Sequence, residues 1–555
     1  MLDKVRRLIK LFGRESWSRY LKVYFFGAIV SLVETASIAA VFPILSWIGP
    51  FSDSAPSWFA KYSSSEALTI LGALYLTGLA LRTWAIFVTA KLNMSEGYAF
   101  GTQLFKTIIE QPYEWHFKNH SANIRAVILN DAQDIISFVM IPLGRLISQI
   151  TLVIAVSLVL LFYFPFPTLF VGATVIVLYG LILIVLKKPI KRDAERQIHA
   201  HTSRHRLSTE AFASIREVRL SHLENKFVEE FAASSNQLAL SSTNRYVYVE
   251  LPKLVLEALI FIIFALMMFG RSASSALVEI TSFPALALFA IASLKLFPMG
   301  HLVFVNLAHL RSGWPLVTQL ENFFKNLQHE EASLKCPPLK KCISLKNISY
   351  RYPDSTHTVL KDMSFDVYVG QKIAITGPSG VGKSTLIDLI AGLLHPSNGT
   401  IEIDAMPLSP GHGRDWQKQL KYCPQSPCLF DMSIEENVTL GSEYSRKELD
   451  DVLKLTCLTD LVAQQPEQAN RTAGEMGRNL SGGQIKRISI ARAMLHPAAV
   501  YIFDEPTSNL DSALASSIMD NVFTAQPNSI FLIVTHDNNL VIKCDKVLEL
   551  APNSL

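Results

Sequence analysis

Six long apolar stretches constrain the fold of this chain more than any other feature of its sequence. Each is long enough to cross a bilayer, which takes about 20 residues in a helix. They occupy residues 23–48, 67–90, 138–163, 167–187, 253–270 and 281–306. Only 18% of the 555 residues are charged, a smaller share than soluble domains usually have. Residues 1–325 are therefore predicted to form an α-helical membrane domain of six transmembrane helices.

Basic residues distinguish the inner connections between these segments from the outer ones. The stretch before the first segment and the loop after the fourth are rich in Lys and Arg, whereas the loops after the first, third and fifth are short and poor in them. Because positively charged loops stay in the cytoplasm, the N-terminus and the chain after the sixth segment are predicted to be cytoplasmic. We expect a multi-pass protein of the cytoplasmic (inner) membrane.

The two inner connections, 91–137 and 188–252, are long, polar and patterned as helices. They are predicted to be cytoplasmic continuations of the membrane helices. The net charge of +4 is small, and the basic residues do not form one face. We therefore expect membrane lipids as surroundings and no nucleic acid as a partner.

A polar linker, residues 326–342, is predicted to separate the membrane domain from a second domain, residues 343–555. From 343 onward, short β-rich runs such as "KIAIT" and "VYIFD" alternate with helical patterns. This alternation predicts an α/β domain with a substantially parallel sheet. All six cysteines lie between 336 and 544 without zinc-site spacing, which indicates reduced cytosolic thiols.

The run "KIAITGPSGVGKSTLIDLIAGLL" has the order strand, glycine-rich loop, helix, and Gly377 to Ser384 matches the phosphate-binding pattern G-x-x-x-x-G-K-[ST]. In this pattern backbone N–H groups surround the phosphates, Lys383 supplies a positive charge and Ser384 binds Mg²⁺. The predicted nucleotide contacts from this loop are Gly377, Pro378, Ser379, Gly380, Val381, Gly382, Lys383, Ser384 and Thr385.

The run "AVYIFDEP" predicts a buried strand that ends in two carboxylates, Asp504 and Glu505. Beside a phosphate loop, Asp504 is predicted to hold the Mg²⁺ shell and Glu505 to polarise the attacking water. The alternative is that the two carboxylates cap a helix or are simply solvated. It becomes a minor alternative because the same sequence contains the phosphate loop.

The stretch "NLSGGQIKRISIARAML" resembles the signature motif of ABC ATPases through Ser481, Gly482, Gly483 and Gln484. Other parts of that family's site follow in order. Tyr352 resembles the aromatic residue that stacks on adenine, Gln425 the Q-loop glutamine, Gly474 to Asn479 the exporter X-loop, Asp511 the D-loop aspartate and His536 the switch histidine. One position departs from the family pattern, since Asn509 stands where Ala is more usual.

The resemblance implies the exporter-type ABC fold, followed by the α/β P-loop ATPase domain. It implies that Glu505 and His536 are catalytic, and that Ser384, Gln425 and Asp504 bind Mg²⁺. It also implies a head-to-tail dimer in which Ser481 to Gln484 of one chain cover the ATP on Lys383 of the other. With one ATPase domain, the chain is expected to pair with a second copy of itself or with a related half-transporter.

Four ionisable residues fall inside the predicted membrane segments: Glu34, Arg82, Glu257 and Lys295. All four are expected about 21 Å from the outer ends of their helices, counted at the rise of an α-helix. Two interpretations stay open. In the first, the acids and bases neutralise one another as structural ion pairs. In the second, the four residues form a polar layer that receives an anionic substrate, and the planar guanidinium of Arg82 suits a phosphate group.

The runs "SLVETASIAAVFPIL", "QPYEWHFKNHSANI" and "LKLFPMGHLV" resemble the membrane half of bacterial lipid-linked oligosaccharide flippases and related polysaccharide transporters. The resemblance implies ATP-driven flipping or export of a lipid-linked glycan by alternating access. A general lipid, drug or peptide exporter is the first alternative. An ATP-gated ABC protein that does not pump is the second, and intact Glu505 and His536 weigh against it.

Overall fold

The computed structural model describes residues 2–40, 64–119, 124–125, 127–163, 165–270, 283–325, 327, 334–353, 355–463, 473–474 and 477–551, and the structural statements below refer to these. The chain divides into two compact units, each with its own internal packing. The helical unit comprises Met1–Gln111 and His116–Gln328, and the α/β unit comprises Pro112–Trp115 and His329–Leu555. The short segment Pro112–Trp115 therefore belongs with the α/β unit, although helices of the other unit flank it in the sequence.

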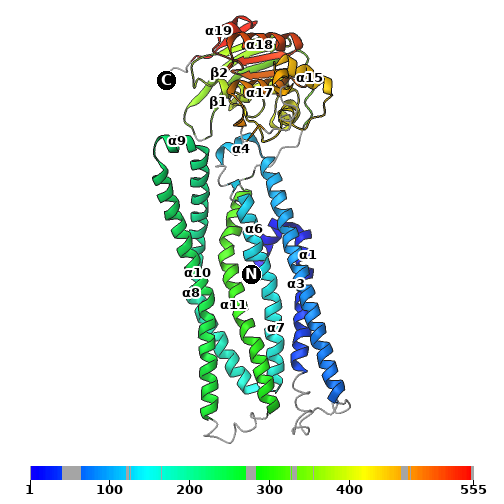
Figure 1. Ribbon diagram of the computed structural model, residues 1–555, viewed down its shortest axis with the longest axis vertical. Coiled ribbons are helices and arrows are strands. Elements are labelled where there is room, and N and C mark those ends of the chain that lie inside the picture. The colour runs from blue at the N-terminus through cyan, green and yellow to red at the C-terminus, as the bar shows by residue number, and fades with distance from the viewer. Residues whose placement is uncertain are drawn as a thin grey trace. The chain divides into compact units, whose positions relative to one another are not determined.

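Long helices make up the helical unit (Figure 1). The principal ones are α1 (Leu2–Ala39), α3 (Ser64–Ile109), α7 (Ile141–Tyr163), α8 (Pro165–Ala213), α10 (Glu224–Gly270) and α11 (Phe283–Lys325). Shorter elements are α4 (Tyr113–Lys118), which crosses the boundary between the units, α6 (Ala132–Ile135), α9 (Ile215–Leu220) and the π-helical segments η2 (Val127–Asp131) and η3 (Ile136–Met140).

Within the described part of the chain, four segments are long and apolar enough to cross a membrane: Arg6–Ala39, Gly72–Ile109, Val127–Phe162 and Gly172–Ala213. They overlap the first four predicted crossings. The fifth and sixth predicted crossings fall in α10 and α11, where many side chains lie outside the described residues, and residues 41–48 of the first and 281–282 of the sixth also lie outside them. The chain is thus a multi-pass membrane protein, and the full count of six stays a prediction.

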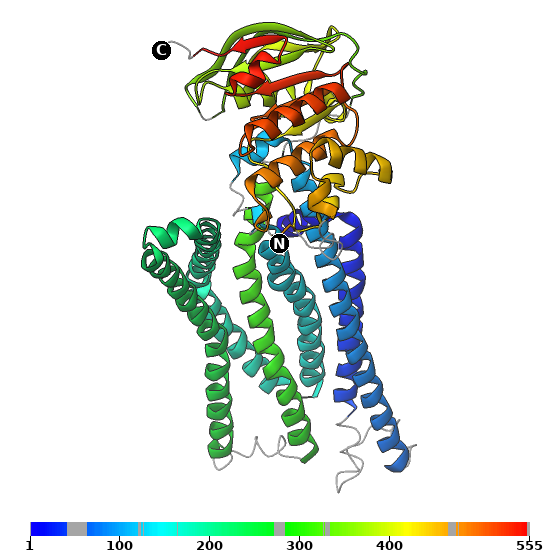
Figure 2. The same cartoon turned by 45° about the horizontal axis from the view of Figure 1, so that its top comes forward.

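Where the structure describes them, the inner connections are mostly helical, which confirms the prediction from their sequence pattern. Helices α8 and α10 run past their apolar segments, pack against each other and are joined by α9 (Figures 1 and 2). On the other side of the unit α1 packs closely on α7. A Cβ added to Gly144 would lie 2.3 Å from the Tyr24 ring, so glycine is needed where these helices meet.

Two sheets form the α/β unit. The first is antiparallel, with the order β2 (Thr358–Tyr368), β1 (Cys342–Arg351), β4 (Asn398–Ile403), β5 (Met406–Pro407). The second has the order β6 (Leu420–Cys423), β7 (Val500–Asp504), β8 (Ile530–Val534), β3 (Lys372–Thr376), β9 (Lys546–Glu549). All four pairings in the second sheet are parallel, which confirms the prediction of a parallel sheet.

The parallel sheet is buried on both faces, as its continuous apolar strands require. Along β7, Val500 and Ile502 enter one core, while Tyr501 and Phe503 enter the other. The phosphate-loop helix α12 (Lys383–Ile390) contributes to the first core, and α17 (Gly482–Met494) and α18 (Ser512–Ala525) contribute to the second. The remaining helices are α13 (Gly413–Gln417), α14 (Ile434–Thr439), α15 (Arg446–Leu455), α16 (Thr459–Ala463), α19 (Asn538–Ile542) and the 3-10 turn Pro410–His412.

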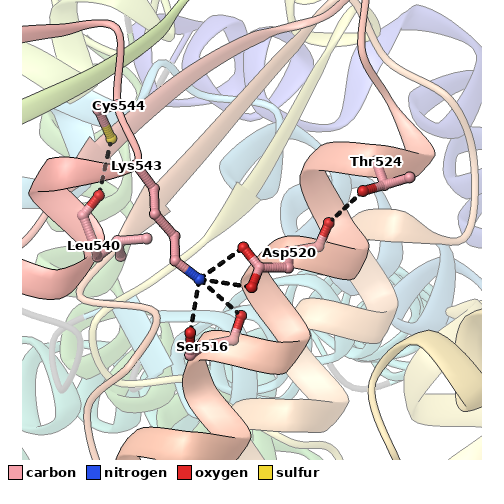
Figure 3. Close-up of polar contacts among 6 residues, drawn as sticks. All are labelled: Ser516, Asp520, Thr524, Leu540, Lys543 and Cys544. Atoms are coloured by element: carbon pink, nitrogen blue, oxygen red, sulfur yellow. Dashed lines mark hydrogen bonds and ion pairs between the residues drawn. The ribbon is translucent and has the colours of Figure 1, made fainter.

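A lysine at the end of α19 ties that helix to α18. The Lys543 ammonium donates to Ser516 Oγ at 2.6 Å and to the two carboxylate oxygens of Asp520 at 2.6 and 2.7 Å (Figure 3). The contact fixes α19, which begins directly after the loop that carries His536. The partners of Lys543 lie on α18, which begins at Ser512 and is capped by Asp511.

Candidate functional site

The predicted nucleotide residues gather at one edge of the parallel sheet. Strands β3, β6, β7 and β8 run in the same direction, so their carboxyl ends meet at that edge. The glycine-rich loop follows β3, Gln425 follows β6, Asp504 ends β7 and His536 follows β8. Open parallel sheets bind ligands at this edge.

Glycines permit the tight path of the phosphate loop. Gly377 has φ 143° and Gly382 has φ 107°, values that residues with a Cβ rarely adopt. A Cβ on Gly377 would lie 2.5 Å from the Leu550 carbonyl oxygen, and one on Gly382 would lie 2.8 Å from Val359. Pro378, Ser379 and Gly380 are exposed, so the outer side of the loop is open to a ligand.

Lys383 is held over its own loop. Its ammonium donates to the carbonyl oxygens of Gly377 at 2.6 Å and Pro378 at 3.1 Å. It also lies 3.2 Å from His536 Nε2, in the loop after β8. The structure thus brings together two residues that are 153 positions apart in the sequence and were predicted from separate motifs.

The two carboxylates differ in their surroundings. Asp504 is only 6% exposed, and burial, followed by the charge of Glu505, raises the pKa of its carboxyl, while Lys486 and Lys383 oppose the shift. Glu505 has φ 48°, an uncommon conformation for a residue other than glycine, and its N–H donates to Val534 at 2.8 Å. Unusual backbone geometry of this kind concentrates at functional sites.

Tyr352, the predicted adenine contact, is anchored to the phosphate-loop helix. Its hydroxyl lies 3.1 Å from Thr385 Oγ1, and its ring packs edge-on against Tyr350 with centroids 5.1 Å apart. Gln425 is exposed beyond the end of β6. Tyr352 therefore lies beside the phosphate-loop helix, and Gln425 follows the carboxyl end of β6, while their contacts to a nucleotide stay predictions.

The signature residues form the N-terminus of α17. Ser481 caps this helix: Gln484 N–H donates to Ser481 Oγ at 3.3 Å, and Ser481 N–H donates to Gln484 Oε1 at 2.8 Å. Ser481 and Gly482 are exposed, and Gly483 is needed because a Cβ there would lie 2.8 Å from the Asn509 carbonyl oxygen. Asp511, the predicted D-loop residue, caps α18 by accepting from Ala513 N–H at 3.1 Å. Part of the predicted X-loop, residues 475–476, lies outside the described residues.

The residues predicted to hold Mg²⁺ offer a hydroxyl, an amide oxygen and a carboxylate at the sheet edge: Ser384, Gln425 and Asp504. These hard oxygen donors suit Mg²⁺, which usually binds through one or two carboxylates together with phosphate oxygens. Among the described residues, no three His, Cys, Asp or Glu side chains form a metal site built from protein alone. The donor set thus fits a metal that arrives with the nucleotide.

Sequence reasoning missed Asp388. It did not identify the partner of Glu114, although the family resemblance implies that the stretch from Glu114 to Asn123 rests on the ATPase domain. Asp388, on α12, is partly buried near Asp504, and burial, followed by the Asp504 charge, raises the pKa of its carboxyl to about 6. Glu114 Oε1 accepts a hydrogen bond from the backbone N–H of His395 at 3.2 Å, and the adjacent Trp115 is 2% exposed. The apolar periodicity of α12 does not indicate that Asp388 lies near Asp504. The contact between Glu114 and His395 joins positions 281 residues apart, so no local pattern indicates it.

The helical unit contains a cavity of about 520 Å³ between α1, α3, α7 and α11. Apolar side chains line it together with a polar set: Ser31, Glu34, Arg82, Thr89, Asn93, Arg145, Ser148 and Gln149. Arg82 Nη1 donates to Glu34 Oε1 at 3.2 Å inside this lining, and 46% of the Arg82 side chain is exposed.

Two of the four predicted intramembrane charges therefore meet. Glu257 lies exposed on α10, outside the described lining of the cavity. The side chain of Lys295 lies outside the described residues. The polar layer of all four residues stays a prediction, whereas the contact between Glu34 and Arg82 is one that the sequence left open.

Comparison with known families also divides the chain into a membrane part and an ATPase part. Residues 23–294 match the family described as the ABC transporter transmembrane region, and residues 360–508 match the ABC transporter family of the ATPase domain. A solved structure of a bacterial Atm1-family ABC exporter with ATP bound superposes with a TM-score of 0.79, covering 96% of this chain and 95% of that one at 18% identity. The fold is that of an Atm1-like exporter.

Curated relatives extend over nearly the whole chain at low identity. A protein named multidrug resistance ABC transporter ATP-binding and permease protein, from Lactococcus lactis, is 23% identical over 98% of this chain and 90% of its own length. A protein named ATP-dependent lipid A-core flippase, from Francisella tularensis, is 24% identical over 93% and 86%. With both domains matched in order on one chain, the protein is an exporter-type ABC half-transporter, whose ATPase domain is coupled to transport.

Proposed function

We propose that this half-transporter flips or exports an amphipathic, anionic lipid, with a lipid-linked oligosaccharide as the specific candidate. The observation that carries the proposal is the cavity of the helical unit, where guanidinium groups stand among apolar side chains. Arg82 and Arg145 both line it, and both are substantially exposed. Cationic groups recognise a phosphate or pyrophosphate head group, and the apolar lining accommodates a lipid chain.

The polar amides of the cavity suit the glycan part of such a substrate. Asn93 and Gln149 line the cavity from α3 and α7. Asn93 Nδ2 donates to the Thr89 carbonyl at 2.8 Å and Gln149 Oε1 accepts from Asn306 at 2.9 Å, so Asn93 Oδ1 and Gln149 Nε2 are the atoms offered to sugar hydroxyls. The name of the Francisella relative, a lipid A-core flippase, supports a substrate that joins lipid and saccharide. Identity of 24% is too low to carry a substrate from one protein to the other, so this support concerns the class alone.

At the sheet edge, the chain's own groups are proposed to bind and orient ATP. The phosphate-loop N–H groups and Lys383 hold the phosphates, Tyr352 stacks on adenine, and Glu505 orients the attacking water. The distance of 3.2 Å between His536 Nε2 and Lys383 Nζ supports a role for His536 at the terminal phosphate. The oxygens of Ser384, Gln425 and Asp504 hold Mg²⁺, which neutralises charge on the phosphates when bound.

Two copies of the chain are proposed to form the working unit. The ATP of one copy is covered by Ser481 to Gln484 of the other, and Asp511 lies at the same interface. The exposure of Ser481 and Gly482 at the start of α17 supports this arrangement, because an exposed helix N-terminus favours the binding of a phosphate group. The N-terminus and the ATPase domains face the cytoplasm of a cell bounded by a cytoplasmic (inner) membrane, where ATP is available.

A short segment of the chain is proposed to carry closure of the ATPase domains to the membrane helices. Pro112–Trp115 belongs to the α/β unit, where Glu114 accepts from His395 N–H and Trp115 is buried. Because α3 ends at Ile109, this docked segment is proposed to transmit the movement to α3.

A general lipid, drug or peptide exporter is the second candidate. The multidrug relative covers 98% of the chain, and apolar residues such as Val30, Ile86 and Leu152 form much of the cavity lining. A hydrophobic cation would be attracted by Glu34 and repelled by the arginines. The sign of the preferred substrate charge therefore separates the two candidates.

The test is ATP-driven movement of a pyrophosphate-linked oligosaccharide lipid across proteoliposome membranes containing the purified full chain. Movement by the native protein and none by Glu505→Gln protein is the expected result. An intact ATPase that moves cationic drugs and not the anionic lipid would overturn the first candidate in favour of the second.

A further inference from the structure

One lysine in the α/β unit is buried without a carboxylate among its hydrogen-bond acceptors. Lys486, on α17, is 1% exposed. Its ammonium donates to three main-chain carbonyl oxygens: Pro424 at 3.1 Å, Gln425 at 2.8 Å and Asp504 at 3.5 Å. Burying an ammonium group costs free energy unless its donors are satisfied, and here three acceptors meet three N–H groups.

These carbonyls lie beyond the end of a strand pair. Strands β6 and β7 pair as far as Cys423 and Phe503. Asp504 continues β7 and pairs with Val534 of β8, whereas Pro424 and Gln425 lie beyond the end of β6. No ladder pairing between the two strands holds their ends together past this point in the described register. The Lys486 ammonium spans the gap, and so cross-links the two backbone segments.

We propose that Lys486 is a positioning residue for the magnesium site: its ammonium fixes the backbone of Gln425 relative to that of Asp504, so that their side-chain oxygens meet one metal ion. The inference rests on the proposed roles of Gln425 and Asp504 as ligands of Mg²⁺. Octahedral Mg²⁺ tolerates little variation in ligand position, so a loosened strand end weakens metal binding before it weakens nucleotide binding.

The same domain offers a matched control. Lys543 also makes several hydrogen bonds through its ammonium, but to Ser516 and Asp520 on α18, away from the strand ends (Figure 3). Lys543→Met removes a comparable set of contacts from a structural helix junction. It is expected to lower the melting temperature without changing the contribution of Mg²⁺ to ATP binding.

The experiment measures the dissociation constant of a fluorescent ATP analogue for the full chain, once with Mg²⁺ and once with EDTA, in the Glu505→Gln background that prevents turnover. The quantity compared is the ratio of the two constants, which reports binding and not hydrolysis. Lys486→Met is expected to reduce the Mg²⁺-dependent gain in affinity about tenfold, the usual cost of losing a group that orients a metal ligand. Binding in EDTA is expected to stay within about threefold.

Lys486→Gln tests whether hydrogen bonds or charge matter. The amide keeps two of the donors without the charge, so the Mg²⁺-dependent gain is expected to fall only about threefold. If the Met variant does not fold, an unchanged ratio in the Gln variant overturns the inference. Equal losses in the Met and Gln variants would assign the effect to charge, and a loss in Lys543→Met would assign it to general destabilisation; both overturn the inference.

Failure of the proposed function is recognised separately. If the reference protein, with Lys486 intact, binds the analogue no more tightly with Mg²⁺ than with EDTA, the magnesium site itself is wrong and the role of Lys486 falls with it. If that protein shows the gain and Lys486→Met retains it, only the role of Lys486 is overturned.

Discussion

The nucleotide site and the membrane cavity are built in opposite ways. At the sheet edge, four parallel strands each deliver a short run of residues to one place, and main-chain groups do much of the work. In the cavity, single side chains from four helices converge, and Glu34 and Arg82 meet although 48 residues separate them. The first site depends on loop conformation, and the second on which faces of packed helices happen to meet.

The difference also appears in how charge is held. Lys383 contacts carbonyl oxygens of its own loop, and Lys486 contacts carbonyls of two strand ends. Arg82 instead contacts a carboxylate, whose charge it offsets. The positive charge of Lys383 thus stays available to phosphate, whereas an anion that entered the cavity would compete with Glu34 for Arg82.

The largest expected effect tests the sheet edge. Glu505→Gln should lower ATP hydrolysis about 100-fold or more, because a positioned base is lost while the shape of the side chain is kept. Phosphate release measured on the full chain in nanodiscs checks the rate, and analogue binding checks that the site is intact. Glu549→Gln, an exposed acid at the end of β9, is the control and should hydrolyse ATP normally. Near-normal hydrolysis by Glu505→Gln would contradict the assigned base.

The next effect tests the cavity. Arg82→Ala should raise the substrate concentration for half-maximal transport about tenfold. Glu34→Gln should change this concentration by less than about threefold, because it removes only the carboxylate that competes with the substrate for Arg82. Basal ATP hydrolysis should stay the same in both. Transport of the anionic lipid in proteoliposomes gives these values.

The double variant separates substrate binding from structural pairing. If Arg82 binds substrate, Arg82→Ala combined with Glu34→Gln behaves like Arg82→Ala alone. If the pair is structural, both single variants lose transport and the double variant recovers it. Arg19→Ala is the matched control, since Arg19 pairs with Glu96 at 2.6 Å between the same two helices, and neither residue is part of the cavity lining.

A smaller effect tests the link between the two regions. Glu114→Ala should reduce substrate stimulation of ATP hydrolysis about threefold, through loss of one charge-assisted hydrogen bond to His395, and leave basal hydrolysis unchanged. Glu110→Ala, at a partly exposed position beyond the end of α3, serves as the control. Normal stimulation in Glu114→Ala would show that this contact does not carry the coupling.

The smallest effect concerns stability near the nucleotide site. The pKa of Asp388 is raised to about 6. The stabilisation that protonated Asp388 gives is present below the ordinary aspartate pKa and is lost as pH rises through about 6. Asp388→Asn should therefore stabilise the protein at pH 7.5 by roughly 1 kcal/mol, with a gain that shrinks as pH falls toward 4. Melting curves of the full chain from pH 5 to 8 measure it, with exposed Asp451→Asn as control. A gain that does not depend on pH would contradict this explanation.

Prediction from the sequence succeeded unevenly, and the reason is physical. The phosphate loop follows β3, Asp504 ends β7 and Ser481 directly precedes α17, as their local sequence patterns predicted, while the roles of these residues at a nucleotide stay predictions. The pair of Glu34 with Arg82 was one of two open interpretations, since any charge in a membrane helix fits either a partner or a substrate. The burial of Lys486 was not predicted, because a lysine on a helix is ordinarily exposed.

The sequence by itself determined the division into a helical and an α/β unit, the bilayer-length helices and the residue types at each strand end, because hydrophobic periodicity and loop geometry are written in neighbouring residues. Only the tertiary structure decided what those groups meet. The sheet order places β8 between β3 and β7, which sets His536 beside Lys383. Helix packing sets Arg82 on Glu34, and the path of α17 buries Lys486 against two strand ends. These contacts join residues far apart in the chain, and no local pattern encodes them.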